Sequence, residues 1–158
     1  MNGIHLVISL IVFLVLGGIF IGEASSAGGG EACAPTQADQ LGPFYKTGAP
    51  ERSVVGTGYI LTGTVKSSRD CAPVHNAKIE FWLTGPDGNY GDAYRATLYS
   101  DKAGSYRFES NKPKPYFGRP PHIHVRVSAD GFMVLVTQHY PDPNMRRDVF
   151  DLVLVPVQ

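Results

Sequence analysis

From residue 57 onward the chain reads as a succession of short alternating segments separated by turns. The segments are expected at 58–67, 77–85, 94–100, 105–110, 122–128, 132–140 and 148–157. Polar turns such as DKAG and PDPN end several of them, and the abundant glycine (18) and proline (12) suit such turns. The sequence contains no convincing helix outside its N-terminal leader. We therefore predict an all-β fold, an antiparallel β-sandwich of the immunoglobulin or prealbumin kind.

The N-terminal leader differs in character from the rest of the chain. Residues 4–22 contain no Lys, Arg, Asp or Glu, and the small residues Ser25 and Ala27 follow. This pattern predicts a signal peptide at 1–27 that is cleaved near Ala27. The apolar run is also long enough to remain as a membrane anchor, since ~20 residues span a bilayer. In either case we expect the rest of the chain to be extracytoplasmic, and secreted if the leader is removed.

The remaining chain divides into an expected N-terminal arm at 28–56 and a β-sandwich domain at 57–158. The arm shows no sustained periodicity. Its few apolar residues, Leu41, Phe44 and Tyr45, are expected to hold it against the domain.

Two cysteines, Cys33 and Cys71, lie in polar, loop-like stretches. In an oxidising compartment such a pair predicts a disulfide, with two unpaired thiols as the alternative. A bridge of this span would stabilise the fold by about 4 kcal/mol.

The segment HIHVRVS contains the most informative polar pattern. A period of two places His122, His124 and Arg126 on one face of a strand and three apolar residues on the other. Neighbouring same-face residues lie about 6.5–7 Å apart, so both imidazoles can reach one metal ion. Two exposed strand histidines are the other interpretation of this pair taken alone.

Two tyrosines in nearby turns extend the candidate metal site. Tyr116 precedes the histidines in KPKPYFG, and Tyr90 ends the turn GPDGNYG. Two tyrosinates and two neutral imidazoles form a donor set that favours ferric iron, Fe(3+), over zinc or copper. Each tyrosine considered alone is more simply interpreted as half-buried packing.

Several stretches together resemble the intradiol ring-cleavage dioxygenases, which are non-haem ferric enzymes. The matching stretches are LGPFY, APVHNAKIEFWLTGPDGNYGD, YSDKAGSYRFES, GRPPHIHVRV and LVTQHY. The resemblance extends over about residues 37–145. The loop between Tyr116 and the histidines is shorter than in many members, and the long N-terminal helical segment of the cytosolic enzymes is lacking.

The resemblance implies roles for individual residues. The metal ligands would be Tyr90, Tyr116, His122 and His124, with Tyr90 as the phenolate that leaves when substrate binds. Arg119 would stabilise negative charge on the substrate, and Gln138 would be a polar residue close to it.

The implied reaction inserts both atoms of O2 into a catechol-type aromatic to give a cis,cis-muconate. A non-catalytic binding module for carbohydrate or a protein partner is the alternative, and a zinc hydrolase is a third possibility. The balance of 14 basic and 14 acidic residues gives no sign of a nucleic-acid partner. The particular catechol and the oligomeric state are left open by the sequence.

Five other aromatic or histidine residues are further candidates for the neighbourhood of the site. Tyr45, Trp82 and Tyr94 are candidates for lining the pocket, although ordinary packing is the simpler interpretation of each. His75 and His139 are expected at the surface or beside the site rather than as ligands, since neither is paired at metal-ligand spacing.

Overall fold

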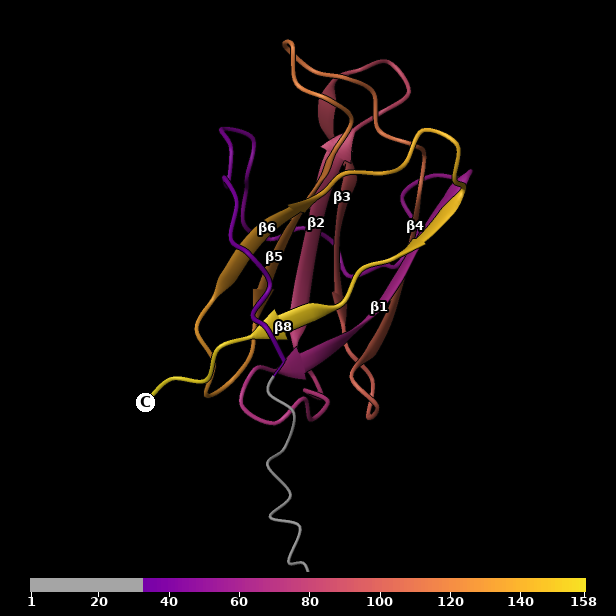
Figure 1. The fold of residues 1–158 in the computed structure, drawn as a ribbon. Coiled ribbons are helices and arrows are strands. Elements are labelled where there is room, and N and C mark those ends of the chain that lie inside the picture. Colours follow the sequence, from indigo (N-terminus) through magenta and orange to yellow (C-terminus); the bar gives the residue numbers. More distant parts are fainter. Residues whose placement is uncertain (1–32) are drawn as a thin grey trace, which may run out of the picture.

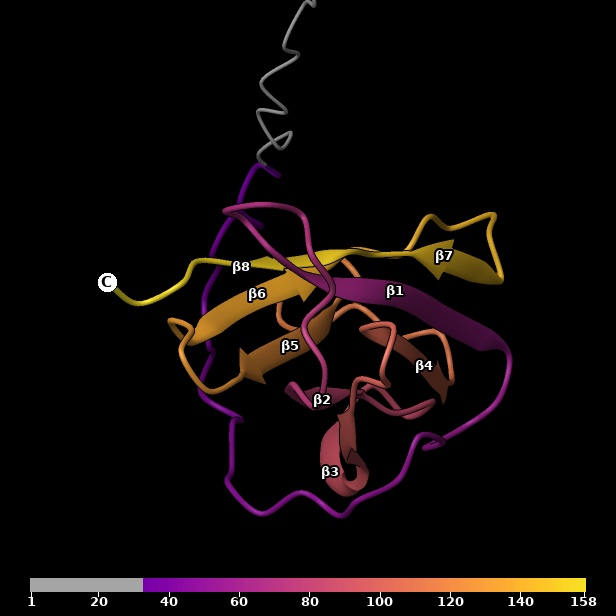
Figure 2. The same ribbon diagram turned by 90° about the horizontal axis from the view of Figure 1, so that it is seen from below.

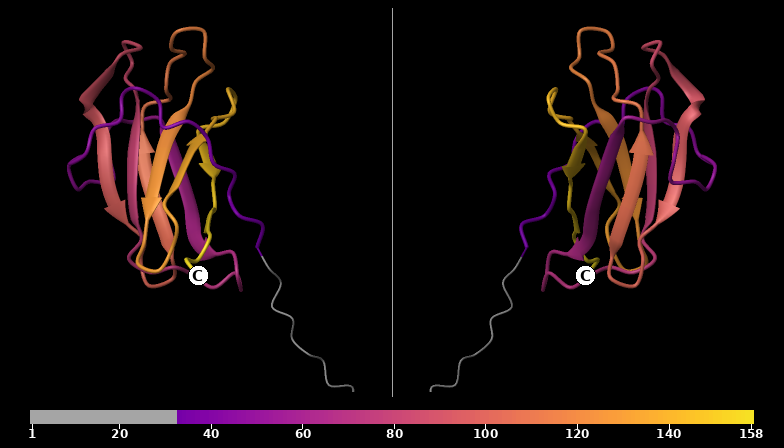
Figure 3. Two further views of the ribbon diagram at one scale, coloured as in Figure 1. Left: turned by 90° about the vertical axis from the view of Figure 1, so that its left-hand side faces the viewer. Right: turned by 90° about the vertical axis from the view of Figure 1, so that its right-hand side faces the viewer.

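The computed structural model describes residues 33–158, so the predicted signal peptide lies outside the described residues. Within them the chain forms eight strands: β1 (Tyr59–Ser67), β2 (Lys78–Thr84), β3 (Tyr90–Tyr99), β4 (Ser105–Ser110), β5 (Ile123–Ser128), β6 (Leu135–His139), β7 (Arg147–Val149) and β8 (Leu152–Leu154). One sheet has the order β3-β2-β5-β6, and in the other β1 pairs with β4, β7 and β8. The two sheets form two layers (Figures 1 and 3), which confirms the predicted all-β sandwich.

The core lies between the two sheets, where the inward positions of the strands are apolar. Ile123, Val125 and Val127 of β5 are fully buried, as a period of two predicts. Phe81 of β2 stacks on Phe108 of β4, with ring centroids 4.2 Å apart. The alternate residues of β2 and β5 consequently project from the outer face of their sheet.

The last predicted segment, 148–157, is not one continuous strand. It divides into β7 and β8, and both run parallel to β1, whereas antiparallel pairing was expected. The division falls at Phe150 and Asp151. The Asp151 carboxylate accepts a hydrogen bond from the Thr64 backbone N–H at 2.9 Å, and it forms an ion pair with Lys66. A side chain thus replaces the backbone partner that a continuous ladder would supply.

The N-terminal arm, described here from residue 33 to 56, runs across the outer face of the β3-β2-β5-β6 sheet. Figure 2 shows this indigo to purple segment passing outside β5, β2 and β3 before the chain enters β1. The Asp39 N–H donates to the carbonyl of Val136 in β6, and the Arg52 N–H donates to that of Thr97 in β3. The arm therefore covers a face that would otherwise be open to solvent.

Two of the three expected apolar anchors of the arm make substantial contacts. Phe44 stacks on Tyr90 at 4.4 Å between ring centroids, and Tyr45 packs on Trp82 at 5.1 Å. Leu41 is 38% exposed, and within the described residues no ring contact holds it as it holds the other two. The arm at this point is also held by the Gln40 carbonyl, which accepts a hydrogen bond from Gln138 Nε2.

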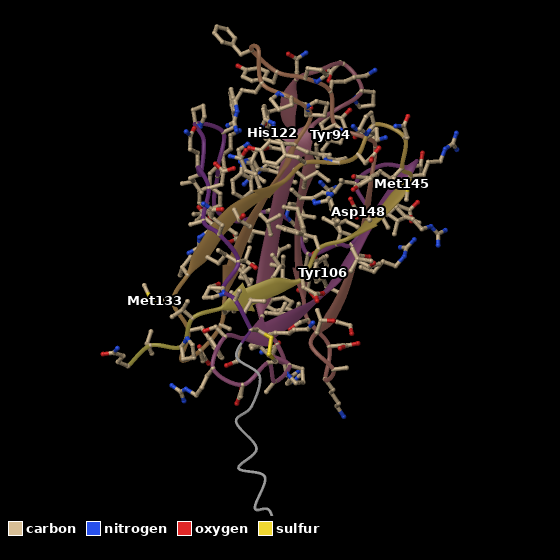
Figure 4. All side chains as sticks on the ribbon, in the orientation of Figure 1. Tyr94, Tyr106, His122, Met133, Met145 and Asp148 are labelled. Carbon is tan, nitrogen blue, oxygen red and sulfur yellow. A yellow bond between two sulfur atoms is a disulfide. The ribbon has the colours of Figure 1, made fainter. Side chains whose placement is uncertain are left out.

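Cys33 and Cys71 form the predicted disulfide, which ties the start of the arm to the turn after β1. In Figure 4 this bridge lies at the lower end of the molecule, whereas His122 lies near the upper end. The arm is thus fixed covalently at one end of the sandwich and reaches the histidines at the other.

No stretch of the described chain, residues 33–158, forms a helix able to cross a membrane.

Gly63 in the middle of β1 provides a test of this packing. A Cβ at this position would collide with the Phe150 carbonyl, which accepts a hydrogen bond from the Tyr106 hydroxyl at 2.6 Å. We expect Gly63→Ala to lower the free energy of unfolding by about 2–3 kcal/mol in urea titrations, because neither group can move freely. Gly91→Ala is the matched control, since its methyl would meet only Tyr94 at an ordinary 3.9 Å. Equal stability of the two variants would contradict this packing.

Candidate metal centre

The four predicted ligands come from three segments at one end of the sandwich. Tyr90 is the first residue of β3 and lies opposite Thr84 of β2. His122 immediately precedes β5, and His124 is the second residue of that strand. Tyr116 lies in the loop that joins β4 to β5. The strand order β3-β2-β5 places β2 between the tyrosine and the histidines, and their side chains meet over its outer face.

Three donor atoms converge at this point. The Tyr90 hydroxyl lies 3.1 Å from His122 Nε2 and 3.1 Å from His124 Nε2, and the two Nε2 atoms are also 3.1 Å apart. Metal–ligand bonds of about 2.0–2.1 Å at right angles would place donor atoms ~3 Å apart. This triangle therefore has the dimensions of three ligands around one ion.

The orientation of each imidazole is fixed by its surroundings. His122 Nδ1 donates a hydrogen bond to the Pro120 carbonyl at 2.7 Å, which leaves the lone pair of Nε2 directed at the triangle. The His124 ring stacks on Trp82, with centroids 4.8 Å apart and planes 4° apart. Gly42 of the arm also lies against this ring, where a Cβ would approach it to 2.9 Å. The arm therefore needs glycine at residue 42 to close over this imidazole.

Burial sets the protonation states of the triangle. The two histidines are 3% and 2% exposed, so the interpretation as exposed strand histidines is wrong. Loss of hydration lowers the pKa of His122, and burial with a contribution from His122 lowers the pKa of His124 to about 4. Burial raises the pKa of Tyr90 to about 12. At neutral pH the imidazoles are therefore neutral, as metal ligands must be, and the phenol keeps its proton until a metal displaces it.

Tyr116 lies beside the triangle. Among the described residues, 33–158, its hydroxyl forms no hydrogen bond with any of the three donor atoms. Its ring meets Tyr90 edge to face at 5.4 Å and Phe44 at 5.1 Å between centroids. All three rings line a cavity of about 320 Å³ that also contains both histidines. This volume is at the lower end of ligand-binding pockets, which suits a molecule built on one aromatic ring.

A network of polar contacts holds Arg119 at the edge of this cavity. Arg119 Nη2 donates to Gln138 Oε1 at 2.9 Å and to the Tyr140 hydroxyl at 2.8 Å. Tyr140 in turn donates to the Asp39 carboxylate at 2.9 Å, and Gln138 Nε2 donates to the Gln40 carbonyl at 2.6 Å. The arm therefore fixes the predicted arginine and glutamine together.

Several arm and loop residues that the sequence pattern did not indicate as site residues also contribute to this site. They are Asp39, Gln40, Gly42, Pro43, Phe44 and Tyr140. The stretches LGPFY and LVTQHY signalled that the segments mattered without showing which side chains would contact the arginine or the imidazoles. Within the described chain no three His, Cys, Asp or Glu side chains gather at one point, so the donor set depends on phenols.

The three aromatic residues weighed as pocket residues have separate roles. Trp82 stacks on the His124 ring and lies outside the cavity that contains the donor triangle. Tyr45 packs on Trp82, and its hydroxyl lies 3.3 Å from the buried Glu80 carboxylate. Tyr94 packs partly buried against the core. None of the three lines that cavity.

The two remaining histidines lie away from the triangle. His139 is 7% exposed and lies away from the triangle, so the expectation of a position at the surface or beside the site is wrong for it. Because Gln138 projects outward from β6, the next residue faces the other sheet, where His139 Nε2 meets the Tyr59 hydroxyl at 2.6 Å. His75 is exposed at the surface beside Asn76.

Comparisons with known proteins agree with this geometry. No family model matches the chain. The chain is 33% identical over 147 residues to hydroxyquinol 1,2-dioxygenase of Rhodococcus opacus, which covers 71% of this chain and 49% of that protein. It is 32% identical over 133 residues to chlorocatechol 1,2-dioxygenase of Pseudomonas putida, which covers 63% of this chain and 51% of that protein. The chain thus spans about half the length of these relatives.

A solved structure matches over its whole length. It is the dioxygenase domain of a dioxygenase carbohydrate-binding protein fusion from the cellulolytic bacterium Streptomyces sp. SirexAA-E. The similarity has a TM-score of 0.71 at 27% identity and covers 78% of this chain and 100% of that one. From these similarities and the shared sandwich, the chain belongs to the intradiol ring-cleavage dioxygenase family.

Proposed function

We propose that this chain is a non-haem ferric dioxygenase that inserts both atoms of O2 into a catechol-type aromatic to give a cis,cis-muconate. The single observation that carries the proposal is the donor triangle of Tyr90, His122 and His124, with sides of 3.1 Å, at the wall of a small cavity. The names of its relatives support the same reaction class, since those proteins are chlorocatechol and hydroxyquinol 1,2-dioxygenases.

The donor chemistry fits ferric iron. Two neutral imidazoles with two phenols that can ionise offer hard oxygen and nitrogen donors, which suit a trivalent iron better than a soft metal. Tyr90, Tyr116, His122 and His124 would hold the ion. When bound, ferric iron would supply the Lewis acidity that favours ionised phenols and the redox capacity that dioxygen chemistry requires.

The chain's own groups would bind and orient the substrate. The rings of Phe44 and Tyr116, which contact each other edge to face, form an aromatic wall of the cavity, against which a planar catechol ring can pack. Tyr90 lines the cavity, where the oxygen of its ionised form could accept a catechol proton. Arg119 is held by Gln138 and Tyr140 at the cavity edge, where its fixed charge would stabilise negative charge on the substrate.

The arm would keep water from the reacting groups. It covers the outer face of the sheet, and Gly42 closes against the His124 ring.

The disulfide that ties the arm is consistent with an oxidising compartment. We therefore also propose that the protein acts outside the cytoplasm, secreted after removal of residues 1–27 or anchored to a membrane by them.

Iron binding is the first consequence to measure. We expect one iron per chain in the purified or reconstituted protein, determined by elemental analysis after gel filtration. His122→Ala and His124→Ala should each lose most of the iron, since each removes one corner of the triangle. His75→Ala is the matched control, because this exposed histidine lies on a different part of the surface from the triangle. This variant should retain the full iron content. Iron loss in all three variants would point to unspecific histidine binding.

Tyr116→Phe tests the second phenolate and the reaction together. The iron-loaded wild type should show a broad visible charge-transfer band that shifts when catechol is added without oxygen, and muconate should appear when air is admitted. Tyr116→Phe should weaken the band and reduce turnover by ~100-fold or more, as expected for the loss of a metal ligand. Tyr99→Phe, at an exposed tyrosine on β3, should change neither. A colourless wild type without iron would instead favour the non-catalytic binding module.

A further inference from the structure

The turn between Tyr116 and Arg119 carries a phenylalanine in an unfavourable position. The Arg119 N–H donates to the Tyr116 carbonyl at 2.8 Å, and the Tyr116 N–H donates to the Arg119 carbonyl at 3.2 Å. The two residues between them, Phe117 and Gly118, have φ values of +47° and +78°. Turns with two positive φ values favour Asn, Asp or Gly, so glycine suits its place and phenylalanine does not.

Exposure is a second cost at the same residue. Phe117 is 93% exposed, more than any other large apolar side chain in residues 33–158. Its nearest aromatic neighbour is Tyr116, at 5.9 Å between ring centroids. An L-residue in a left-handed conformation and an apolar ring in water both act against phenylalanine here. Within residues 33–158 the exposed ring makes too little packing contact to offset these two costs.

The position of Phe117 indicates what it contacts when the protein works. It lines the same cavity of about 320 Å³ as the donor triangle, together with Pro43 and Phe44 of the arm. The turn belongs to the β4–β5 loop, which Figure 1 shows in orange projecting past the ends of the strands. Phe117 therefore forms part of the rim of the candidate metal centre.

The loop is braced, so the ring is presented in a defined place. The Lys114 N–H donates to the Thr84 hydroxyl at 2.9 Å, and that hydroxyl donates to the Lys114 carbonyl at 2.8 Å. Prolines further restrict the backbone on both sides of the turn, at 113, 115, 120 and 121. A solvent-exposed aromatic ring on a braced backbone provides a surface for stacking.

We propose that Phe117 determines specificity by packing against an aryl substituent of the substrate, so that the preferred substrates are catechols with an aryl group at ring position 4. The inference rests on the proposed function. A catechol whose two hydroxyls face the donor triangle directs its position 4 away from that triangle, toward the mouth of the cavity. A second ring attached there reaches the rim, where Phe117 and Pro43 offer apolar surface.

The test compares 4-phenylcatechol with catechol in the iron-loaded protein. The wild type should have a kcat/KM for 4-phenylcatechol roughly tenfold above that for catechol, as one additional aromatic contact predicts. Phe117→Asn should abolish this preference through KM, and the turn should keep its shape, because asparagine is well suited to the left-handed conformation. Phe117→Trp should retain the preference.

Met133→Asn is the matched control, since it also removes an exposed apolar side chain, 58% exposed. Figure 4 shows Met133 far from His122, so this variant should keep the preference for the aryl substrate. Thermal unfolding should show both asparagine variants folded. An unchanged substrate ratio in Phe117→Asn, or an equal loss for both substrates, would overturn the proposal.

A binding measurement separates failure of this inference from failure of the proposed function. Trp82 is the single tryptophan and stacks on His124, so its fluorescence reports on occupancy of the site. Without oxygen, the wild type should bind 4-phenylcatechol about tenfold more tightly than catechol, and Phe117→Asn should bind the two alike. Binding of this kind without turnover would refute the reaction and keep the role of Phe117. If Phe117→Asn changes only self-association in sedimentation, the exposed ring is a contact between copies, and the role of Phe117 is refuted.

Discussion

Coverage of the outer sheet face by the N-terminal arm is the constraint on which the rest of this structure depends. Without that segment, His122 and His124 would be strand residues facing water. With it, they are 3% and 2% exposed, and burial keeps them neutral. The arm is also the source of Phe44 and Gly42, which contact Tyr90 and the His124 ring. The candidate metal centre is therefore a property of the sheet and the arm together.

Covering a polar sheet face requires that each buried charge has partners. Glu80 of β2 is 2% exposed, and its carboxylate meets Arg126 at 2.7 Å and Lys78 at 3.2 Å. The Tyr45 hydroxyl of the arm approaches the same carboxylate at 3.3 Å. An unpaired buried carboxylate would be strongly destabilising, so these partners let the arm close next to the histidines. The disulfide at the far end of the sandwich restricts the same segment.

The short loop that joins β4 to β5 carries three side chains with different proposed roles at the site. Between Lys114, which Thr84 of β2 holds, and the start of β5, the β4–β5 loop presents Tyr116, Phe117 and Arg119 to a single cavity. Two backbone hydrogen bonds between Tyr116 and Arg119 close the turn. The loop backbone therefore carries the proposed ligand, the rim and the cation at one place in the fold.

Much of the fold could be predicted because it follows from local pattern. The alternation in HIHVRVS placed Ile123, Val125 and Val127 in the core and the histidines on the opposite face, as the structure has them. The division of the last segment at Asp151 could not be predicted, because it depends on a hydrogen bond to Thr64, which is 87 residues away. The burial of His139 was missed although its alternation with Gln138 was visible, because surface position was judged from spacing alone.

The sequence by itself determined the strand pattern, the cysteine pair and the kinds of donor that the site offers. Those depend on residue type and on a period of two, which are local properties. Only the tertiary structure decided that Tyr90, His122 and His124 meet at 3.1 Å and that Asp39 and Tyr140 hold Arg119. It alone decided that Phe117 stands exposed at the rim. Distances of this kind arise from the pairing of β3, β2 and β5 and from the course of the arm, and residues far apart in the chain fix both.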